Sequence, residues 1–479
     1  MFCQLEILRH CFPSSVRRIL EDLPESLDET YERILREIRK PNQGHAHRML
    51  QCLVAAVRPL RVKELAEVLA VDFVAEGIPK LNVDWRWEDQ EEAVMLACSS
   101  MVIIVEDGDS RIVQFSHFSV KEYLTVNRLA EPIRDISRYH IRPEAAHTIF
   151  GQACLGVLLG LDDRVDRDNI ENFPLARYAA QYWPTHARFE SASPRLKDGM
   201  EYLFDADEPY FATWLWIHNE DQHRSLSTLS PEEPEAVPLY YAAMLGFRHL
   251  AEHLIAEHPE HVNARGGSQE TPMHVAALAG QADILSLLLE HGVDIDCRET
   301  FGQTPLHSAS WLGEVEAGQF LLDHGADIDA QDDNGWTPLF SAAIKAQVEF
   351  ARMLLERGAA IDARNTSGET ALHQAVMGGD IPTVRLLVEQ GADVEACDES
   401  GKTPSHLGSE WGHDDIVELL SDYGVSPVVP LAILSEYSRY GPGFMDLLTG
   451  YGSDSVESQS EYGTESVELR SEYDAESIE

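Results

Sequence analysis

A four-residue motif recurs in the C-terminal half of the chain at a constant spacing. Thr-Pro-Leu-His or a close variant occurs five times, and each copy begins 33 residues after the one before. The copies begin at Thr271, Thr304, Thr337, Thr370 and Thr403. A constant period requires successive units to present equivalent faces to their neighbours, as in a solenoid of stacked units. The C-terminal half is therefore predicted to be an array of repeats.

The motif and its period resemble those of the ankyrin repeat. Thr is a good N-cap, and Pro suits the first helical position because the helix does not use the amide hydrogen there. A degenerate copy, Val237-Pro238-Leu239-Tyr240, begins 34 residues before Thr271. We therefore count six units and expect the array to span residues 226–424.

A glycine is expected to end the first helix of each unit in a left-handed conformation. Five units carry it, as Gly246, Gly280, Gly313, Gly379 and Gly412. Ala346 replaces this glycine in the fourth unit, and its Cβ predicts local strain on the order of 1 kcal/mol. The turn that connects one unit to the next, called the finger, usually contains a glycine. In the second unit Gln269 occupies the position of this glycine, which predicts a displaced or looser turn.

Four histidines follow the repeat period: His274, His307, His373 and His406. Equivalent positions on stacked helices lie roughly 8–10 Å apart, too far to share one metal ion, so we interpret these histidines as hydrogen-bonding spacers. The cluster of His45, His47 and Cys52 lies on one helical stretch without an evident fourth ligand. No metal site, cofactor or catalytic Ser-His-Asp or Cys-His set is expected.

The charge balance restricts the class of partner. The chain has 37 basic and 82 acidic residues, a net charge of −45, whereas nucleic acids and anionic membranes require a basic surface. We therefore expect protein partners, and no nucleic acid or membrane. The sequence has no apolar run of about 18 residues and no signal-peptide pattern. Its seven scattered cysteines indicate a reducing compartment, so the cytoplasm is expected, with the nucleus left open.

The N-terminal half predicts a winged helix. Helical patterns over 27–38, 45–57, 62–70 and 88–99 precede β-rich runs over 101–105 and 111–115, which flank a hairpin signal. The second of the two helices in 45–70 carries one lysine against two glutamates, which disfavours DNA reading. The fold class is thus mainly α: a helical remnant at 1–40, a winged helix at 41–130 and a helical domain at 131–225, followed by the ankyrin-repeat solenoid. Four aromatic residues of the helical domain are expected to be packing residues: Tyr182, Trp183, Trp214 and Trp216.

Four segments, 23–35, 58–66, 115–124 and 172–183, resemble the region downstream of the nucleotide-binding core in fungal NACHT-type signal-transduction NTPases. The resemblance implies that the array senses a ligand while the winged helix restrains or releases an NTPase switch. The P-loop pattern G-x-x-x-x-G-K-[ST] is missing; its nearest match, Gly401-Lys402-Thr403, has Ala396 in place of the first glycine. We therefore expect a chain that binds but does not catalyse. Its start inside an amphipathic pattern suggests a fragment or a shortened gene product.

The recurring motif residues and glycines form the framework of an ankyrin array, and binding depends on the positions that vary between the units. In the family, two positions just before the helix-ending glycine face the concave side, and here they form two largely apolar columns. The predicted protein-binding residues on this surface are Met244, Leu278, Trp311, Leu312, Ile344, Met377 and Trp411. Partial burial in the groove between helices is the alternative interpretation.

The finger tips are expected to form a rim around this surface. The rim residues are Arg298, Glu299, Asp332, Asp333, Trp336, Arg364, Asp398, Glu399 and Lys402. Their mostly acidic character predicts a partner with an apolar centre and basic flanks, unless the charges serve only solvation. Residues 425–479 predict an acidic, disordered tail. The sequence favours a recognition scaffold in a NACHT-ankyrin signalling protein; the alternatives are a piece of an NTPase switch and a ubiquitin-ligase substrate adaptor.

Overall fold

A computed structural model describes residues 27–73, 78–108, 110–126, 136–161, 165–166, 169–188, 194–206, 208–222, 236–266 and 269–423. The chain divides into two units, residues 1–425 and 426–479, and every described residue belongs to the first unit. The expectations for residues 1–26 and for the acidic tail lie outside the described residues. Helices dominate the described part and strands are few, which confirms the mainly α fold class.

The first elements form the winged helix. Its three-stranded sheet has the order β1-β5-β4, and both pairings are antiparallel, with Leu60 opposite Val113 and Val102 opposite Phe115. The strands are β1 (Leu60–Arg61), β4 (Val102–Asp107) and β5 (Ser110–Phe115). The helices are α3 (Leu27–Glu37), α4 (Gln43–Ala55), α5 (Val62–Glu67), α6 (Gln90–Cys98) and α7 (Phe118–Thr125). The predicted hairpin and the helices before it are confirmed.

Short elements complete this region. A second sheet pairs β2 (Val71–Asp72) with β3 (Lys80–Leu81) in antiparallel register. The 3₁₀ helices of this region are η2 (Lys40–Asn42), η3 (Val68–Ala70), η4 (Val83–Trp85) and η5 (Ser99–Met101). Two more, η7 (Ser137–Tyr139) and η8 (Ile170–Asn172), belong to the helical region that follows.

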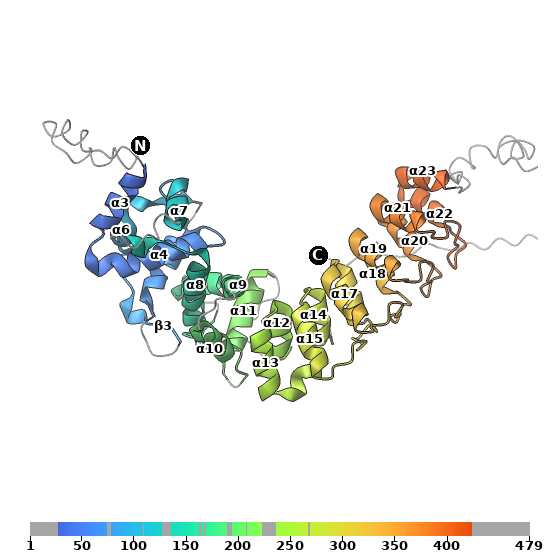
Figure 1. The fold of residues 1–479 in the computed structure, drawn as a ribbon, viewed down its shortest axis with the longest axis horizontal. Coiled ribbons are helices and arrows are strands. Elements are labelled where there is room, and N and C mark those ends of the chain that lie inside the picture. The colour runs from blue at the N-terminus through green and yellow to red at the C-terminus, as the bar shows by residue number, and fades with distance from the viewer. Residues whose placement is uncertain are drawn as a thin grey trace, which may run out of the picture. The chain divides into compact units, whose positions relative to one another are not determined.

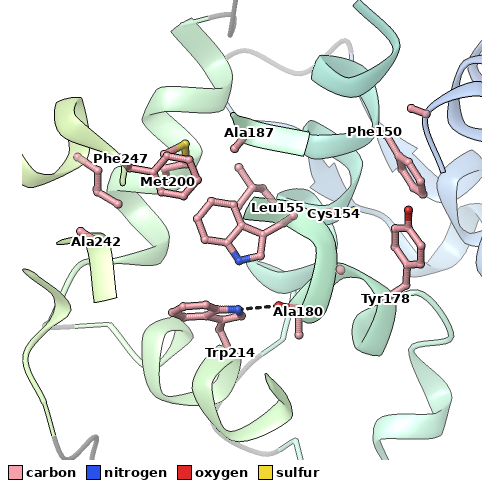
Figure 2. Close-up of a cluster of buried hydrophobic side chains, with 14 of the residues drawn as sticks. Phe150, Cys154, Leu155, Tyr178, Ala180, Ala187, Met200, Trp214, Ala242 and Phe247 are labelled. Carbon is pink, nitrogen blue, oxygen red and sulfur yellow. Dashed lines mark hydrogen bonds between the residues drawn. The ribbon is translucent and has the colours of Figure 1, made fainter. Parts of the chain in front are cut away.

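A helical region follows, and its aromatic core extends into the first repeat. Its helices are α8 (Pro143–Leu158), α9 (Ala176–Ala187), α10 (Pro194–Leu203) and α11 (Tyr210–Gln222). Trp183 and Trp214 are fully buried, and the indole Nε1 of Trp214 donates to the carbonyl oxygen of Ala180 at 3.0 Å (Figure 2). Trp183 also stacks on Phe247 of the first repeat. The prediction that both tryptophans are packing residues is confirmed.

Six helix pairs form the array (Figure 1). The first helices are α12 (Pro238–Leu245), α14 (Pro272–Leu278), α16 (Pro305–Leu312), α18 (Pro338–Ile344), α20 (Ala371–Met377) and α22 (Pro404–Trp411). The second helices are α13 (Arg248–Glu257), α15 (Ala282–Glu290), α17 (Val315–Asp323), α19 (Val348–Glu356), α21 (Ile381–Glu389) and α23 (Asp414–Asp422). Each first helix packs on the first helix of the next unit, as stacked repeats require.

The helix-ending residues adopt the expected left-handed conformation. All five predicted glycines have a positive φ, and Ala346 takes the same conformation with φ 56°. Gln269 also has a positive φ, 61°. Its finger keeps the hydrogen-bond frame of the next one: Gln269 N–H donates to Gly266 O at 2.8 Å, just as Gly302 N–H donates to Glu299 O at 3.1 Å. Gln269 therefore adopts the conformation of the glycine it replaces. Residues 267 and 268 of this turn lie outside the described residues, so the displaced or looser turn stays a prediction.

The framework histidines connect neighbouring units. Nε2 of His307 lies 2.9 Å from the carbonyl oxygen of Trp336, and Nδ1 of His307 accepts the N–H of Thr304 at 3.1 Å. A carbonyl oxygen only accepts, so Nε2 carries the proton and the ring is neutral. His274 and His373 make the same contacts with Gln303 O and Lys402 O, at 3.0 and 3.3 Å. For these three histidines, the predicted role as hydrogen-bonding spacers is confirmed.

A ladder of carboxylates also connects the units. Asp329 Oδ1 accepts the backbone N–H of Ala360 at 2.8 Å, and Asp362 Oδ1 accepts that of Asp393 at 2.9 Å. One unit earlier, Asp296 accepts the N–H of Asp327 at 3.2 Å. Each of these carboxylates therefore satisfies a backbone donor in the following unit, 31 residues ahead.

Two further features concern the described residues only. Cys52, Cys98, Cys154, Cys297 and Cys397 are all free thiols. None of the described helices combines the length and the apolar character that crossing a bilayer would require.

Candidate protein-binding surface

The first predicted column lies at the C-terminal end of the first helix in each unit. Its members Met244, Leu278, Trp311, Ile344 and Met377 are half-buried. Met244 and Ile344 pack against the hydrophobic core, so part of the apolar surface of these two side chains serves the array itself. The alternative of partial burial thus describes this column, which offers a partner only the outer part of each side chain.

Trp311 is fixed in the column by contacts on two sides. The ammonium of Lys345 lies 4.0 Å from the centroid of the indole ring, a cation–π contact. The Gln347 side-chain amide donates to the carbonyl oxygen of Trp311 at 3.3 Å. Two units later, Nε2 of His413 lies 3.2 Å from the carbonyl oxygen of Met377. Neighbouring units therefore hold the backbone of this column, which limits the entropy lost on binding.

The second column is the more accessible one. Leu312 is 51% exposed and Trp411 is 59% exposed. Leu245 and Ala279, at the same position in the first two units, are half-buried, while Lys345 and Gly378 are exposed. Large apolar side chains gain binding energy only if a partner can reach them, so Leu312 and Trp411 are the strongest candidates on this surface.

Two of the predicted acidic rim residues are directed into their own turns. Glu299 and Asp332 are 8% and 5% exposed. A side-chain oxygen of Glu299 accepts the N–H of Phe301 at 2.8 Å, and one of Asp332 accepts the N–H of Asn334 at the same distance. Asp398 accepts the N–H of Lys402 at 2.7 Å in the last finger. These carboxylates stabilise the turns and leave a partner little of their surface.

The two rim arginines lie across neighbouring fingers. Nη1 of Arg298 donates to Gly302 O in its own finger at 2.9 Å and to Gln331 O in the next finger at 2.7 Å. Arg364 bonds Gly368 O and the carbonyl of the next unit in the same way. Both side chains are exposed, but their guanidinium groups donate hydrogen bonds to backbone carbonyl oxygens. They therefore make the fingers more rigid and also contribute positive charge.

The remaining rim residues differ in accessibility. Asp333 and Glu399 are exposed, and their backbone amides donate to the preceding finger. Nζ of Lys402 donates to Glu410 at 2.6 Å, while Trp336 is half-buried and stacks on Phe340 with centroids 5.4 Å apart. Asp333 and Glu399 are therefore the rim carboxylates most available to a partner.

Phe301 is a candidate contact residue that the motif analysis missed. It is 62% exposed at a finger tip. The equivalent positions of the later fingers hold Asn334, Ser367 and Ser400, so an aromatic residue breaks a polar pattern there. A comparison of the finger positions that the repeat motif does not fix would therefore have identified Phe301 from the sequence.

A second surface that the sequence did not reveal lies in the winged helix. A cavity of about 710 Å³ opens between α4 and the segment around η4. Trp85 and Trp87 are half exposed at its edge, and the guanidinium of Arg48 lies 4.6 Å from the Phe73 ring centroid on its wall. Trp85 and Trp87 are close to charged residues in sequence, so hydrophobic periodicity gave no signal for them.

Known families and one curated protein resemble parts of this chain. Ankyrin repeats match in three copies, over residues 239–332, 296–365 and 358–430. The winged-helix domain described for GPI inositol-deacylase matches residues 31–133. The azaphilone pigments biosynthesis cluster protein L of Monascus ruber is 34% identical over 289 residues, which span 56% of this chain and 60% of that protein. The chain thus carries a winged-helix domain followed by ankyrin repeats, a mainly α architecture whose second part is a protein-interaction module.

Proposed function

We propose that the ankyrin array captures an extended or helical segment of a partner protein along the strip formed by Leu312, Trp411 and the outer face of Trp311. The observation that carries the proposal is the exposure of Leu312 and Trp411, at 51% and 59%, at equivalent positions three units apart. Two exposed apolar side chains at equivalent positions of different units give a partner two anchors on the array.

Charge narrows the class of partner. The exposed carboxylates of Asp333 and Glu399 lie at the fingers, and the whole chain has a net charge of −45. Basic residues flanking an apolar segment would be steered toward such a surface. The partner segment is therefore one with apolar side chains at its centre and Lys or Arg at its flanks.

The biological context belongs to the same proposal. The resemblance to NACHT-type NTPases supports a sensor and regulatory role in a cytoplasmic signalling protein, with the array as the ligand-binding arm. Nucleotide hydrolysis would then reside in sequence not contained in this chain. An in-frame P-loop upstream of Met1 in the genomic sequence would support this context, and a genomic sequence without one would favour a free-standing recognition protein.

The binding proposal is tested by site-specific crosslinking in the full chain. A photo-reactive amino acid replaces Leu312 in one sample and Ile381 in the other; Ile381 is 37% exposed, but it lies on the second helix of its unit. Mass spectrometry of the crosslinked peptides identifies the partner. The proposal expects a defined partner peptide with basic flanks from position 312 and none from position 381. Equal, unspecific labelling from both positions would refute it.

A further inference from the structure

One turn of the array departs from the repeat pattern. The second helix of the first unit is followed by His258-Pro259-Glu260-His261, whereas the next two units have His291-Gly292 and His324-Gly325 at the equivalent place. Gly292 and Gly325 have φ values of 80° and 94°. The proline ring holds φ near −65°, so Pro259 cannot adopt this conformation. The chain instead continues as a 3₁₀ helix, η9 (Pro259–Asn263).

This change of conformation brings three metal-binding side chains together. A 3₁₀ helix has three residues per turn, so side chains at i and i+3 lie above one another. The rings of His258 and His261 accordingly stack with centroids 4.9 Å apart. Glu260 Oε1 is 3.5 Å from His258 Nδ1, and one ligand atom from each of the three residues lies within 4.8 Å of the others.

The backbone holds this arrangement in place. His261 N–H donates to His258 O at 3.0 Å, and Ala264 N–H donates to His261 O at 3.0 Å. Val262 is 5% exposed and anchors η9 in the core between the first and the second repeat. The three side chains therefore project from a fixed turn, so less conformational entropy is lost when they bind an ion.

The surroundings favour a cation. A cavity of about 250 Å³ lies beside the turn, and His253, Glu257 and His258 line one wall. Asp198, Glu201 and Asp205 line the opposite side, on α10 and the residues after it. None of the described residues that line this cavity is a lysine or an arginine. An excess of carboxylates over lysine and arginine makes the local potential negative and attracts positive ions.

We propose that His258, Glu260 and His261 bind a divalent transition-metal ion of the zinc class. Two imidazole nitrogens and one carboxylate oxygen are ligands that Zn²⁺ prefers, whereas Ca²⁺ and Mg²⁺ require oxygen ligands. Water or a carboxylate of the adjacent cavity completes the coordination. The ion would fix the end of the first repeat, next to its contact with the helical region.

The site is tested by titrating the full, chelator-treated chain with ZnCl₂ in an isothermal calorimeter. A stoichiometric binding step is expected, and it should weaken by at least about tenfold in His261→Asn and in Glu260→Gln. His291→Asn is the matched control, because His291 occupies the position of His258 in the next unit without the following Glu and His. Circular dichroism of the metal-free variants verifies that they remain folded.

Three outcomes would overturn the proposal. The first is the absence of a stoichiometric step, and the second is a step that persists unchanged in the double variant H258N/H261N. If His291→Asn weakens binding as much as His261→Asn, the ion binds elsewhere and the assignment is also refuted.

Discussion

The indole ring of Trp183 stacks on the phenyl ring of Phe247, with centroids 5.3 Å apart and planes inclined by 24°. Trp183 belongs to α9, and Phe247 lies between the two helices of the first repeat. Both side chains are buried, at 0% and 8% exposure. The helical region therefore covers the first repeat as a capping unit would, and the two parts share one core.

Replacing Phe247 by alanine is expected to destabilise the chain by about 3–5 kcal/mol, because it removes a buried aromatic ring and leaves a cavity against Trp183. Urea unfolding followed by circular dichroism measures the change. Phe301→Ala is the control: its side chain is 62% exposed, so its effect should stay within about 0.5 kcal/mol. Equal effects of the two substitutions would contradict a shared core.

Two non-glycine residues occupy left-handed positions, and replacing either by glycine is expected to stabilise the array. Ala346→Gly and Gln269→Gly remove a Cβ penalty of about 1–2 kcal/mol, of which the greater entropy of glycine in the unfolded chain offsets about half. Thermal unfolding should show a higher Tm for each variant. Ala360→Gly is the control, because Ala360 is exposed but has no positive φ, and it should lower Tm or leave it unchanged. A lower Tm for Ala346→Gly would contradict strain at this residue.

The array tolerates Ala346 because its neighbour in the next unit is short. A Cβ on Gly313 would lie 2.3 Å from Gln347 Oε1, since the glutamine side chain packs directly on that glycine. The corresponding residue beyond Ala346 is Asp380, whose carboxylate instead accepts the N–H of Thr383 at 3.2 Å. Gly313→Ala should therefore destabilise the chain more than Ala346→Gly stabilises it.

The stability of the array should fall in mild acid. Burial lowers the pKa of His274 to about 4, and it also lowers the pKa values of His307 and His373. The folded state then binds fewer protons than the unfolded state between the ordinary value of 6.5 and about 4, so stability decreases as pH falls through this window. Urea midpoints at several pH values measure the effect. His274→Gln should flatten the profile, and an unchanged slope would exclude His274 as a contributor.

Partner binding should depend on the exposed column. The double variant L312S/W411A is expected to weaken binding of the crosslinked partner peptide by at least about 100-fold, since two apolar anchors are lost. Both side chains are more than half exposed, so the free energy of unfolding should change by less than about 1 kcal/mol. Fluorescence anisotropy gives Kd. Ile381→Ala is the control, and a similar loss in this control would contradict the proposed surface.

Much of the fold follows from local sequence rules, while the candidate surface depends on more than the repeat period. The four-residue motif with its degenerate first copy and the five helix-ending glycines together locate the six helix pairs, because capping and left-handed residues are local requirements. The period also identifies both columns before the glycine. It cannot distinguish half-buried Leu245 from exposed Leu312 in the same column, because that difference depends on how far each side chain leans into the groove.

The behaviour of individual polar residues required the three-dimensional structure. Glu299 and Asp333 are both acidic finger residues in sequence, yet one stabilises its turn and the other remains exposed. Gln269 takes the left-handed conformation of the glycine it replaces, and its N–H donates to Gly266 O. His258 and His261 become neighbours only because Pro259 converts a glycine turn into a 3₁₀ helix, which is a consequence of backbone conformation rather than of composition.

The carboxylate ladder of Asp296, Asp329 and Asp362 has a direction, since each acid bonds an amide of the following unit and none bonds one of the preceding unit. Gene duplication of one complete 33-residue period adds an acceptor together with its donor and leaves every rung paired. Duplication of part of a period leaves an acid or an amide without its counterpart. Such an array can lengthen or shorten during evolution by whole units. A change by part of a unit is disfavoured, because it leaves a carboxylate or a backbone amide without its hydrogen-bond partner.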